Sequence, residues 1–183
     1  KHSLDDGQYG ARRAACERAA EILGVELLAD IAIEDLPGAL ERLAATDGDD
    51  ADDADELVKR TRHVVTEIDR TRRLVALLQD GQPLRGEKLA EAGRLMDASH
   101  ESLRVDYECT CPELDVAVEA ARAAGAHGAR MTGGGFGGSA IALVEADAVQ
   151  DVARAVAEAY QREGFNPPAF LDAVPAAPAG RFA

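Results

Sequence analysis

Residues 133–138 are the part of this chain whose composition most directly indicates chemistry. Five of the six residues are glycine. Each glycine costs conformational entropy on folding, so such a cluster implies positive φ angles or a backbone that another group approaches closely. Bare backbone N–H groups in a loop of this kind can bind the oxygens of a phosphate. The candidate loop consists of Gly133, Gly134, Gly135, Phe136, Gly137 and Gly138.

Two common nucleotide-binding patterns do not fit this segment. Gly133, Gly135 and Gly138 match G-x-G-x-x-G, but a strand-like run follows where a dinucleotide fingerprint would open a helix. The Gly-Lys-Ser/Thr ending of a P-loop is absent. Two interpretations remain open: a wide hairpin without a ligand, and a loop whose N–H groups face a phosphate or a substrate.

Hydrophobic periodicity predicts the helices that would position this loop. Gly24, Gly81 and Pro83 are the expected breaks between them. One inward stripe is expected along the third helix; it comprises Leu57, Val64, Ile68, Val75 and Leu78. The expected helices cover residues 8–23, 36–43, 57–80, 84–103, a stretch that begins at 112, and 148–164.

The pattern changes after Gly125 from helical to strand-like spacing. Residues 129–131 read as a short strand, and the apolar run 140–144 predicts a strand buried on both faces. Residues 169–174 predict a final strand. Helices followed by strand–loop–strand–helix–strand predict one α+β domain over residues 1–183. Its last part fits a ferredoxin-like split unit, a small sheet covered by several helices.

The charge and hydropathy of the chain limit its partners. With 34 acidic and 20 basic residues, the net charge of −14 argues against nucleic acid or an anionic membrane as a partner. No apolar run reaches the ~18 residues of a membrane span. The start at Lys1 carries no stretch of signal-peptide character. The three cysteines do not suit a disulfide framework. We therefore expect a cytoplasmic protein.

Residues 47–56 carry a dense run of acidic side chains. If Asp47 is taken as position 1 of a calcium-binding loop, the turn-glycine position holds Asp52 and the twelfth position holds Val58 instead of Glu. The run is therefore expected to be a solvated loop that leads into the next helix.

Two other groups of polar residues have simpler interpretations than a metal site. His63 and Glu67 are four residues apart on a helix, but no second ligand pair accompanies them, so a surface or packing role is favoured. His100, Cys109 and Cys111 lack the spacing of a zinc site. We therefore expect no metal ligands in this chain.

The first expected helix carries residues that could face a ligand. Arg12 and Arg13 could reach a phosphate, although an exposed position on the helix surface is favoured. Tyr9 by itself is an ordinary aromatic residue at a helix start. These residues gain a specific meaning only from a wider comparison.

Residues 129–144, which include the glycine loop, are similar to the third motif of the GHMP small-molecule kinases. Three further segments resemble the galactokinase family within that superfamily, and all appear in the family order. They are Ser99–Arg104 with Asp106–Glu108 and Cys111–Asp115; Arg62–Ile68; and His2–Leu4 with Tyr9, Arg12, Arg13, Cys16 and Glu17.

This resemblance implies ATP-dependent phosphorylation of galactose at C1 with Mg²⁺. It implies that Tyr9 contacts the sugar, and that Gly133–Gly138 border the active site on its nucleotide-binding side. Counterparts of the family's main sugar-binding segment, its nucleotide loop and its catalytic aspartate are not found. The chain is therefore expected to lack the N-terminal catalytic half, to contain no catalytic residue and to be inactive alone.

Three alternatives are kept beside this reading. The first is a related kinase for an N-acetylhexosamine or for arabinose. The second is a non-catalytic protein that binds galactose and ATP and regulates a partner. The third is an acidic helical interaction domain with an incidental glycine hairpin, which would bind no nucleotide.

Overall fold

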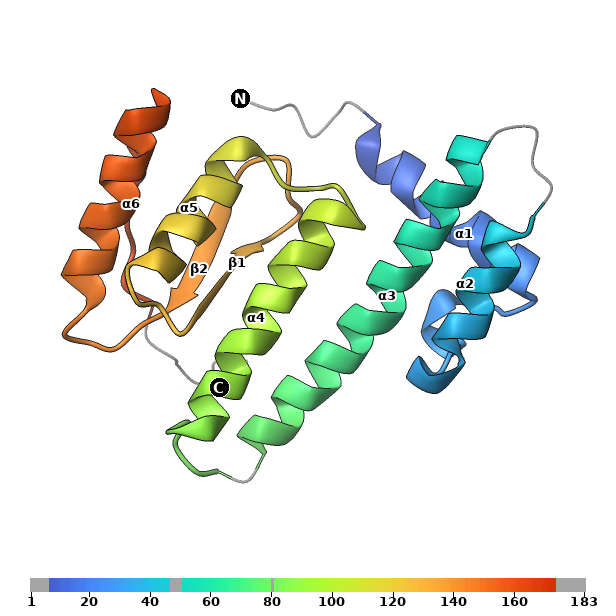
Figure 1. Ribbon diagram of the computed structural model, residues 1–183, viewed down its shortest axis with the longest axis horizontal. Coiled ribbons are helices and arrows are strands. Elements are labelled where there is room, and N and C mark those ends of the chain that lie inside the picture. The colour runs from blue at the N-terminus through green and yellow to red at the C-terminus, as the bar shows by residue number, and fades with distance from the viewer. Residues whose placement is uncertain (1–6, 47–50, 80, 174–183) are drawn as a thin grey trace, which may run out of the picture.

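The computed structural model describes residues 7–46, 51–79 and 81–173. Helices α1 to α3 lie on one side of the molecule, the sheet with α5 and α6 lies on the other, and α4 lies between them (Figure 1). The elements are α1 (Gln8–Leu23), two 3-10 turns (Leu28–Asp30 and Ile33–Asp35), α2 (Leu36–Ala44), α3 (Ala51–Leu78), α4 (Glu87–Val105), α5 (Pro112–Ala123), β1 (Gly128–Thr132), β2 (Ser139–Leu143) and α6 (Val149–Glu163).

Helices α1, α2 and α3 share one hydrophobic core. Ala15 and Ala19 of α1 are fully buried, and their small side chains let α1 approach α3 closely. Leu43 of α2 and Leu57 of α3 fill the remaining space. Burial of each leucine contributes about 1.5–3 kcal/mol. The expected helices at 8–23 and 36–43 are therefore confirmed.

Helix α3 begins earlier than expected and is less buried at its end. Residues 51–56 are helical rather than a loop, because an acidic side chain near a helix N-terminus, such as that of Asp53, interacts favourably with the helix dipole. Asp53 pairs with Arg18 of α1 at 2.6 Å. Residues 47–50 lie outside the described part of the chain. The inward stripe was wrong at Val75 and Leu78, which are 44% and 52% exposed.

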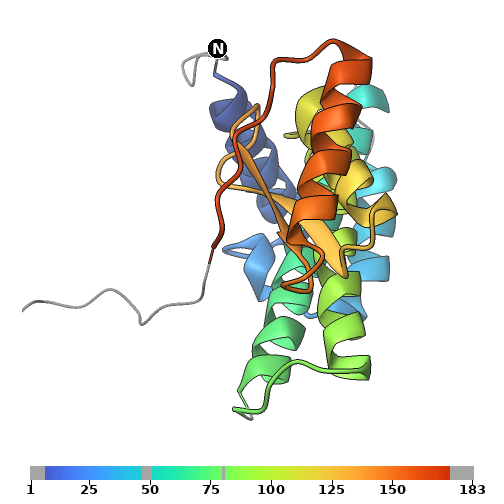
Figure 2. The ribbon, with the colours of Figure 1, turned by 90° about the vertical axis from the view of Figure 1, so that its left-hand side faces the viewer.

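The sheet is a two-stranded antiparallel hairpin in which Gly128 pairs with Leu143 and Thr132 with Ser139. Helices α4 and α5 pack against β1, and α5 also packs against β2 (Figure 2). Met131 is buried by this packing. Burial of β2 on both faces was wrong, because Ile141 is 46% exposed and no described helix covers that side of the strand.

The order α5–β1–β2–α6 is the inner part of a split β–α–β unit, so the α+β class with a small sheet covered by helices is confirmed. The expected final strand is not formed over 169–173, where Phe170 is 50% and Leu171 94% exposed. A strand needs a pairing partner, and none of the described strands lies beside this segment. Val174 lies outside the described residues. The single-domain assignment stays a prediction.

Candidate functional site

The glycine loop turns the chain from β1 into β2, and its backbone adopts conformations that glycine favours. The φ angles of Gly133 and Gly135 are +85° and +86°, and those of Gly137 and Gly138 are +114° and +102°. Phe136 also has a positive φ of 56°, which is uncommon for a residue with a Cβ atom. The glycine-rich composition is therefore required by the path of the backbone.

Close neighbours also restrict the loop. A Cβ atom at Gly134 would collide with the hydroxyl oxygen of Tyr9, and one at Gly135 would collide with the carbonyl oxygen of Cys109. The loop is thus held between the start of α1 and the segment that precedes α5.

Tyr9 connects α1 to the loop directly. Its hydroxyl donates a 2.6 Å hydrogen bond to the carbonyl oxygen of Gly134. Its ring meets the Phe136 ring edge to face, with centroids 5.3 Å apart and an interplanar angle of 87°. Because Tyr9 remains 38% exposed, it can contact both the loop and a molecule in solution. The structure therefore brings together two of the sequence-predicted site elements.

The two arginines of α1 differ in their surroundings. Arg12 donates from Nε to the Tyr107 carbonyl at 2.7 Å and from Nη2 to the Glu108 carbonyl. Arg13 is exposed and pairs with Glu17 at 2.8 Å. The expected exposed position is correct for Arg13, whereas Arg12 is partly buried against the segment beside the loop.

Loop amides are the available donors of the site. The amide of Phe136 donates to the Cys109 carbonyl at 2.7 Å. The N–H groups of the five loop glycines have no hydrogen-bond partner in the described part of the chain. Unpaired backbone amides in a glycine loop suit an anionic ligand. The loop can therefore contribute donors to a phosphate.

A buried polar cluster supports the segment on which the loop rests. Arg60 is 4% exposed and binds the Asp106 carbonyl at 2.5 Å and the Glu108 carboxylate at 2.8 Å. Ser102 donates to the Asp106 carboxylate at 3.0 Å. His63 lies 3.0 Å from the Ser102 hydroxyl, and burial lowers the pKa of His63 to about 4. His63 is therefore neutral near pH 7.

Glu67 and the two cysteines Cys109 and Cys111 have structural surroundings. Burial alone would raise the pKa of Glu67, but hydrogen bonds from Ser99 and Arg70 hold it below its ordinary value. Cys109 and Cys111 are buried free thiols, and burial raises the pKa of both. Within the described residues, no three His, Cys, Asp or Glu side chains come together as metal ligands.

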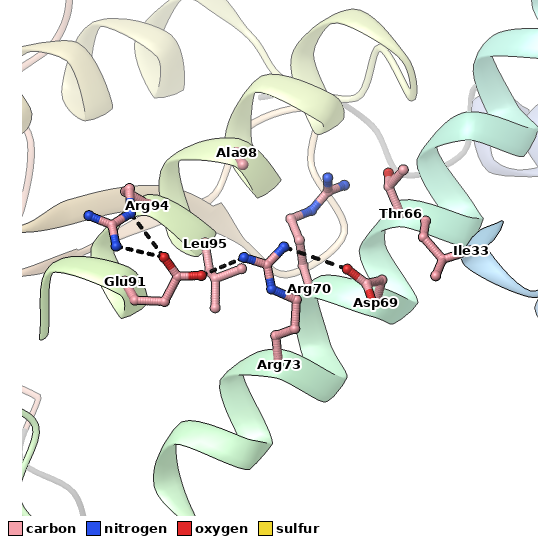
Figure 3. Close-up of a pocket in the computed structure, with 9 residues that line it drawn as sticks. All are labelled: Ile33, Thr66, Asp69, Arg70, Arg73, Glu91, Arg94, Leu95 and Ala98. Carbon is pink, nitrogen blue, oxygen red and sulfur yellow. Dashed lines mark hydrogen bonds and ion pairs between the residues drawn. The ribbon is translucent and has the colours of Figure 1, made fainter. Parts of the chain in front are cut away.

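A hollow of about 320 Å³ lies between α3 and α4 (Figure 3). Arg73 crosses it to pair with Glu91 at 2.5 Å and with Asp69 at 3.6 Å. Glu91 also pairs with Arg94 at 2.8 Å. Because these charges already neutralise one another, the hollow is best explained as an ion-pair network between two helices. It does not include the glycine loop.

Comparison with known proteins identifies the domain to which the loop belongs. Residues 74–162 match the family model described as GHMP kinases C terminal, and the match includes both strands and the glycine loop. Residues 74–162 form a domain of the GHMP kinase C-terminal family. No helix in the described ranges is both long and apolar enough to cross a membrane.

Galactokinases are among the relatives of this chain. The chain is 48% identical over 181 residues to a galactokinase of Streptomyces coelicolor, which covers 99% of this chain and 43% of the relative. It is 45% identical over 161 residues to a human galactokinase, covering 87% and 37%. The chain therefore spans about two fifths of the length of these relatives.

A solved structure supports the same relationship. The crystal structure of Lactococcus lactis galactokinase complexed with galactose matches with a TM-score of 0.77 and 33% identity, covering 91% of this chain and 40% of that one. The helical arrangement around the hairpin is thus shared with a galactokinase. The resemblance read from the sequence motifs is confirmed.

The sequence did not indicate which residues fix the segment 106–108, against which the glycine loop packs. Arg60 and Arg12 reach the segment 106–108 from two different helices. The only signal was that Arg12 belongs to a segment with family resemblance. Periodicity could not indicate that its guanidinium faces residues more than 90 positions away.

Proposed function

We propose that this chain is the C-terminal part of a galactokinase, which phosphorylates galactose at C1 with ATP and Mg²⁺. The observation that carries the proposal is the hydrogen bond between Tyr9 and Gly134, which joins the expected sugar residue to the expected nucleotide-side loop. The identity to galactokinases over nearly the whole chain supports it. A cytoplasmic location, where ATP is available, belongs to the same proposal.

The residues present fit part of such a site. The free amides of the glycine loop suit phosphate oxygens. The protein ligands of Mg²⁺ and the catalytic base are assigned to the upstream part of the protein. When bound, Mg²⁺ neutralises charge on the transferring phosphate. The role of this chain is to orient the reactants and to keep the loop close to them.

Tyr9 is proposed as a sugar contact. Its O–H is donated to Gly134, but the phenolic oxygen retains acceptor capacity for a sugar hydroxyl. A sugar bound there would contact a side chain that is itself fixed to the loop. Sugar and nucleotide would then be positioned on one connected surface.

The function is tested by ADP release with galactose and Mg-ATP. The protein from its complete reading frame is expected to turn over at about 1–100 per second, and the 183-residue chain alone is expected to show no turnover. Reactions without sugar are the control. ATP turnover by the chain alone would contradict the division of roles. No turnover by the complete protein with any hexose in a panel would contradict the kinase reading.

The sugar identity is read from the same panel. Preferred turnover of an N-acetylhexosamine or arabinose would replace galactose as the substrate. Binding of galactose and ATP without turnover would instead identify a regulatory protein. Absence of both binding and turnover would leave an interaction domain with a glycine hairpin.

Tyr9→Phe is expected to raise the KM for galactose about 3- to 10-fold, which corresponds to loss of the hydrogen bond accepted from the sugar. The substitution also removes the bond to the Gly134 carbonyl, but the edge-to-face contact with Phe136 can remain. The KM for ATP should change less than about twofold. Steady-state kinetics of the complete protein measure both. Tyr160→Phe is the matched control, because Tyr160 donates to the Glu113 carbonyl at 2.7 Å, away from the loop. Equal effects of the two substitutions would argue against the sugar contact.

A further inference from the structure

The guanidinium of Arg12 is fully engaged by groups of the protein. Besides the two carbonyls of residues 107 and 108, Nη1 donates to the Gln8 carbonyl at 3.1 Å. The guanidinium carbon lies 4.7 Å from the centroid of the Phe136 ring, over its face. All three nitrogens are thus occupied. This arrangement opposes a direct phosphate contact by Arg12.

The groups around Arg12 belong to two segments that contact each other. One is the segment 107–109, in which Glu108 has a positive φ of 53°. The other is the tip of the glycine loop, where Phe136 has a positive φ and donates to the Cys109 carbonyl. Arg12 therefore contacts both segments, and each of them contains a residue with an uncommon positive φ angle.

We propose that Arg12 is the positioning residue of the glycine loop: it fixes the tip at Phe136 against residues 107–109 and contacts neither substrate. The kinetic part of this inference rests on the proposed kinase function. The structural part stands on the hydrogen bonds and the ring contact alone.

Arginine is specifically suited to this place. Its planar guanidinium can donate to two backbone carbonyls while its flat face covers an aromatic ring. A lysine ammonium is a compact point charge and cannot do both. We therefore expect Arg12→Lys to keep only part of the activity and of the loop's protection from hydrogen exchange. Substitution of an exposed arginine on the same helix should change neither.

Loss of Arg12 should loosen the loop rather than unfold the domain. Glycine has little intrinsic conformational preference, so contacts at the tip determine where the free amides point. A displacement of about 1 Å in a positioned group can lower a rate about 100-fold. The effect is expected on kcat, because the substrates retain their own contacts.

The test compares Arg12→Gln and Arg12→Lys with Arg13→Gln in the complete protein. Arg13 lies next to Arg12 but, among the residues that the structure describes, it pairs only with Glu17. For Arg12→Gln we expect kcat to fall about 10- to 100-fold, with both KM values within about threefold. Hydrogen exchange in the peptide 131–138, which contains the bonded Phe136 amide, should accelerate about tenfold. Arg12→Lys should lie between, and Arg13→Gln should match the unmodified protein.

Two outcomes would overturn the inference. Unchanged exchange of 131–138 in Arg12→Gln would show that Arg12 does not hold the loop. A raised KM for ATP at unchanged kcat would make Arg12 a nucleotide ligand. If the unmodified protein phosphorylates no sugar, the proposed function fails, and the exchange comparison still decides the role of Arg12.

Discussion

Gly135→Ala is expected to lower the kcat of the complete protein about 100-fold or more, whereas Gly133→Ala is expected to lower it about tenfold or less. The two glycines have nearly equal φ angles, +86° and +85°. A Cβ atom at Gly133 meets nothing within 4 Å, whereas one at Gly135 collides with the Cys109 carbonyl and lies 3.0 Å from the Cys109 Cβ. The left-handed conformation costs about 1–2 kcal/mol in either variant. The collision additionally forces the loop away from Cys109.

Steady-state kinetics and thermal unfolding of both variants check this prediction. Gly133 and Gly135 lie in the same loop and have nearly the same φ angle. The difference in kcat between the two variants therefore measures the effect of the close approach at Cys109. If the two variants lose the same activity, contact with Cys109 does not decide the position of the loop. Restored activity in Gly135→Ala after a change at Cys109 is not expected, because the collision is with a backbone atom.

Gly93→Ala is expected to destabilise the complete protein by about 3 kcal/mol, while Gly38→Ala is expected to stabilise it by up to about 1 kcal/mol. Gly93 lies where α4 touches the start of β1, and a Cβ atom there would lie 2.5 Å from the His127 carbonyl carbon. The neighbour is backbone, which cannot rotate away as a side chain would. Gly38 is also helical, but its Cβ would meet nothing within 4 Å.

Chemical denaturation of the two variants measures both signs in one experiment. Gly38→Ala isolates the ordinary gain of replacing a helical glycine by alanine. A stabilised or neutral Gly93→Ala protein would mean that α4 and β1 can separate without loss. It would then contradict the tight packing between α4 and β1.

The helices were largely predictable because local spacing determines them. A repeat near 3.6 residues marks the buried side of a helix without knowledge of its partner. The predicted first helix matches α1 at both ends, and Pro112 begins α5 as its composition indicated. The hairpin around the glycine loop was also predictable, since the loop lies between two strand-like runs.

Burial was less predictable than helix or strand formation. Ile141, Val75 and Leu171 are apolar but exposed among the described elements. An apolar side chain is more stable when it is buried, but its type does not show whether it is buried by residues of this chain or by another part of the protein. Under the proposed function, the upstream part of the protein is where we expect such a surface.

The residues of the candidate site could be predicted from the sequence, but the contacts between them could not. Tyr9 and the glycine loop were singled out through resemblance, but the hydrogen bond between them could not follow from spacing. Arg60 was not singled out, because a charged residue in a helix is usually solvated. Its burial depends on Asp106 and Glu108, which are distant in sequence.

The hydrogen bond from Tyr9 to Gly134 also bears on the time course of folding, because it joins residues 125 positions apart. Closing a chain of that length costs roughly 4 kcal/mol of entropy before the contact offsets it. Helix α1 forms from local contacts and needs no such closure. At ~5–20 residues per second, synthesis separates Tyr9 from Gly134 by on the order of ten seconds. We therefore expect the loop to reach its final position late, after α1 has packed against α2 and α3.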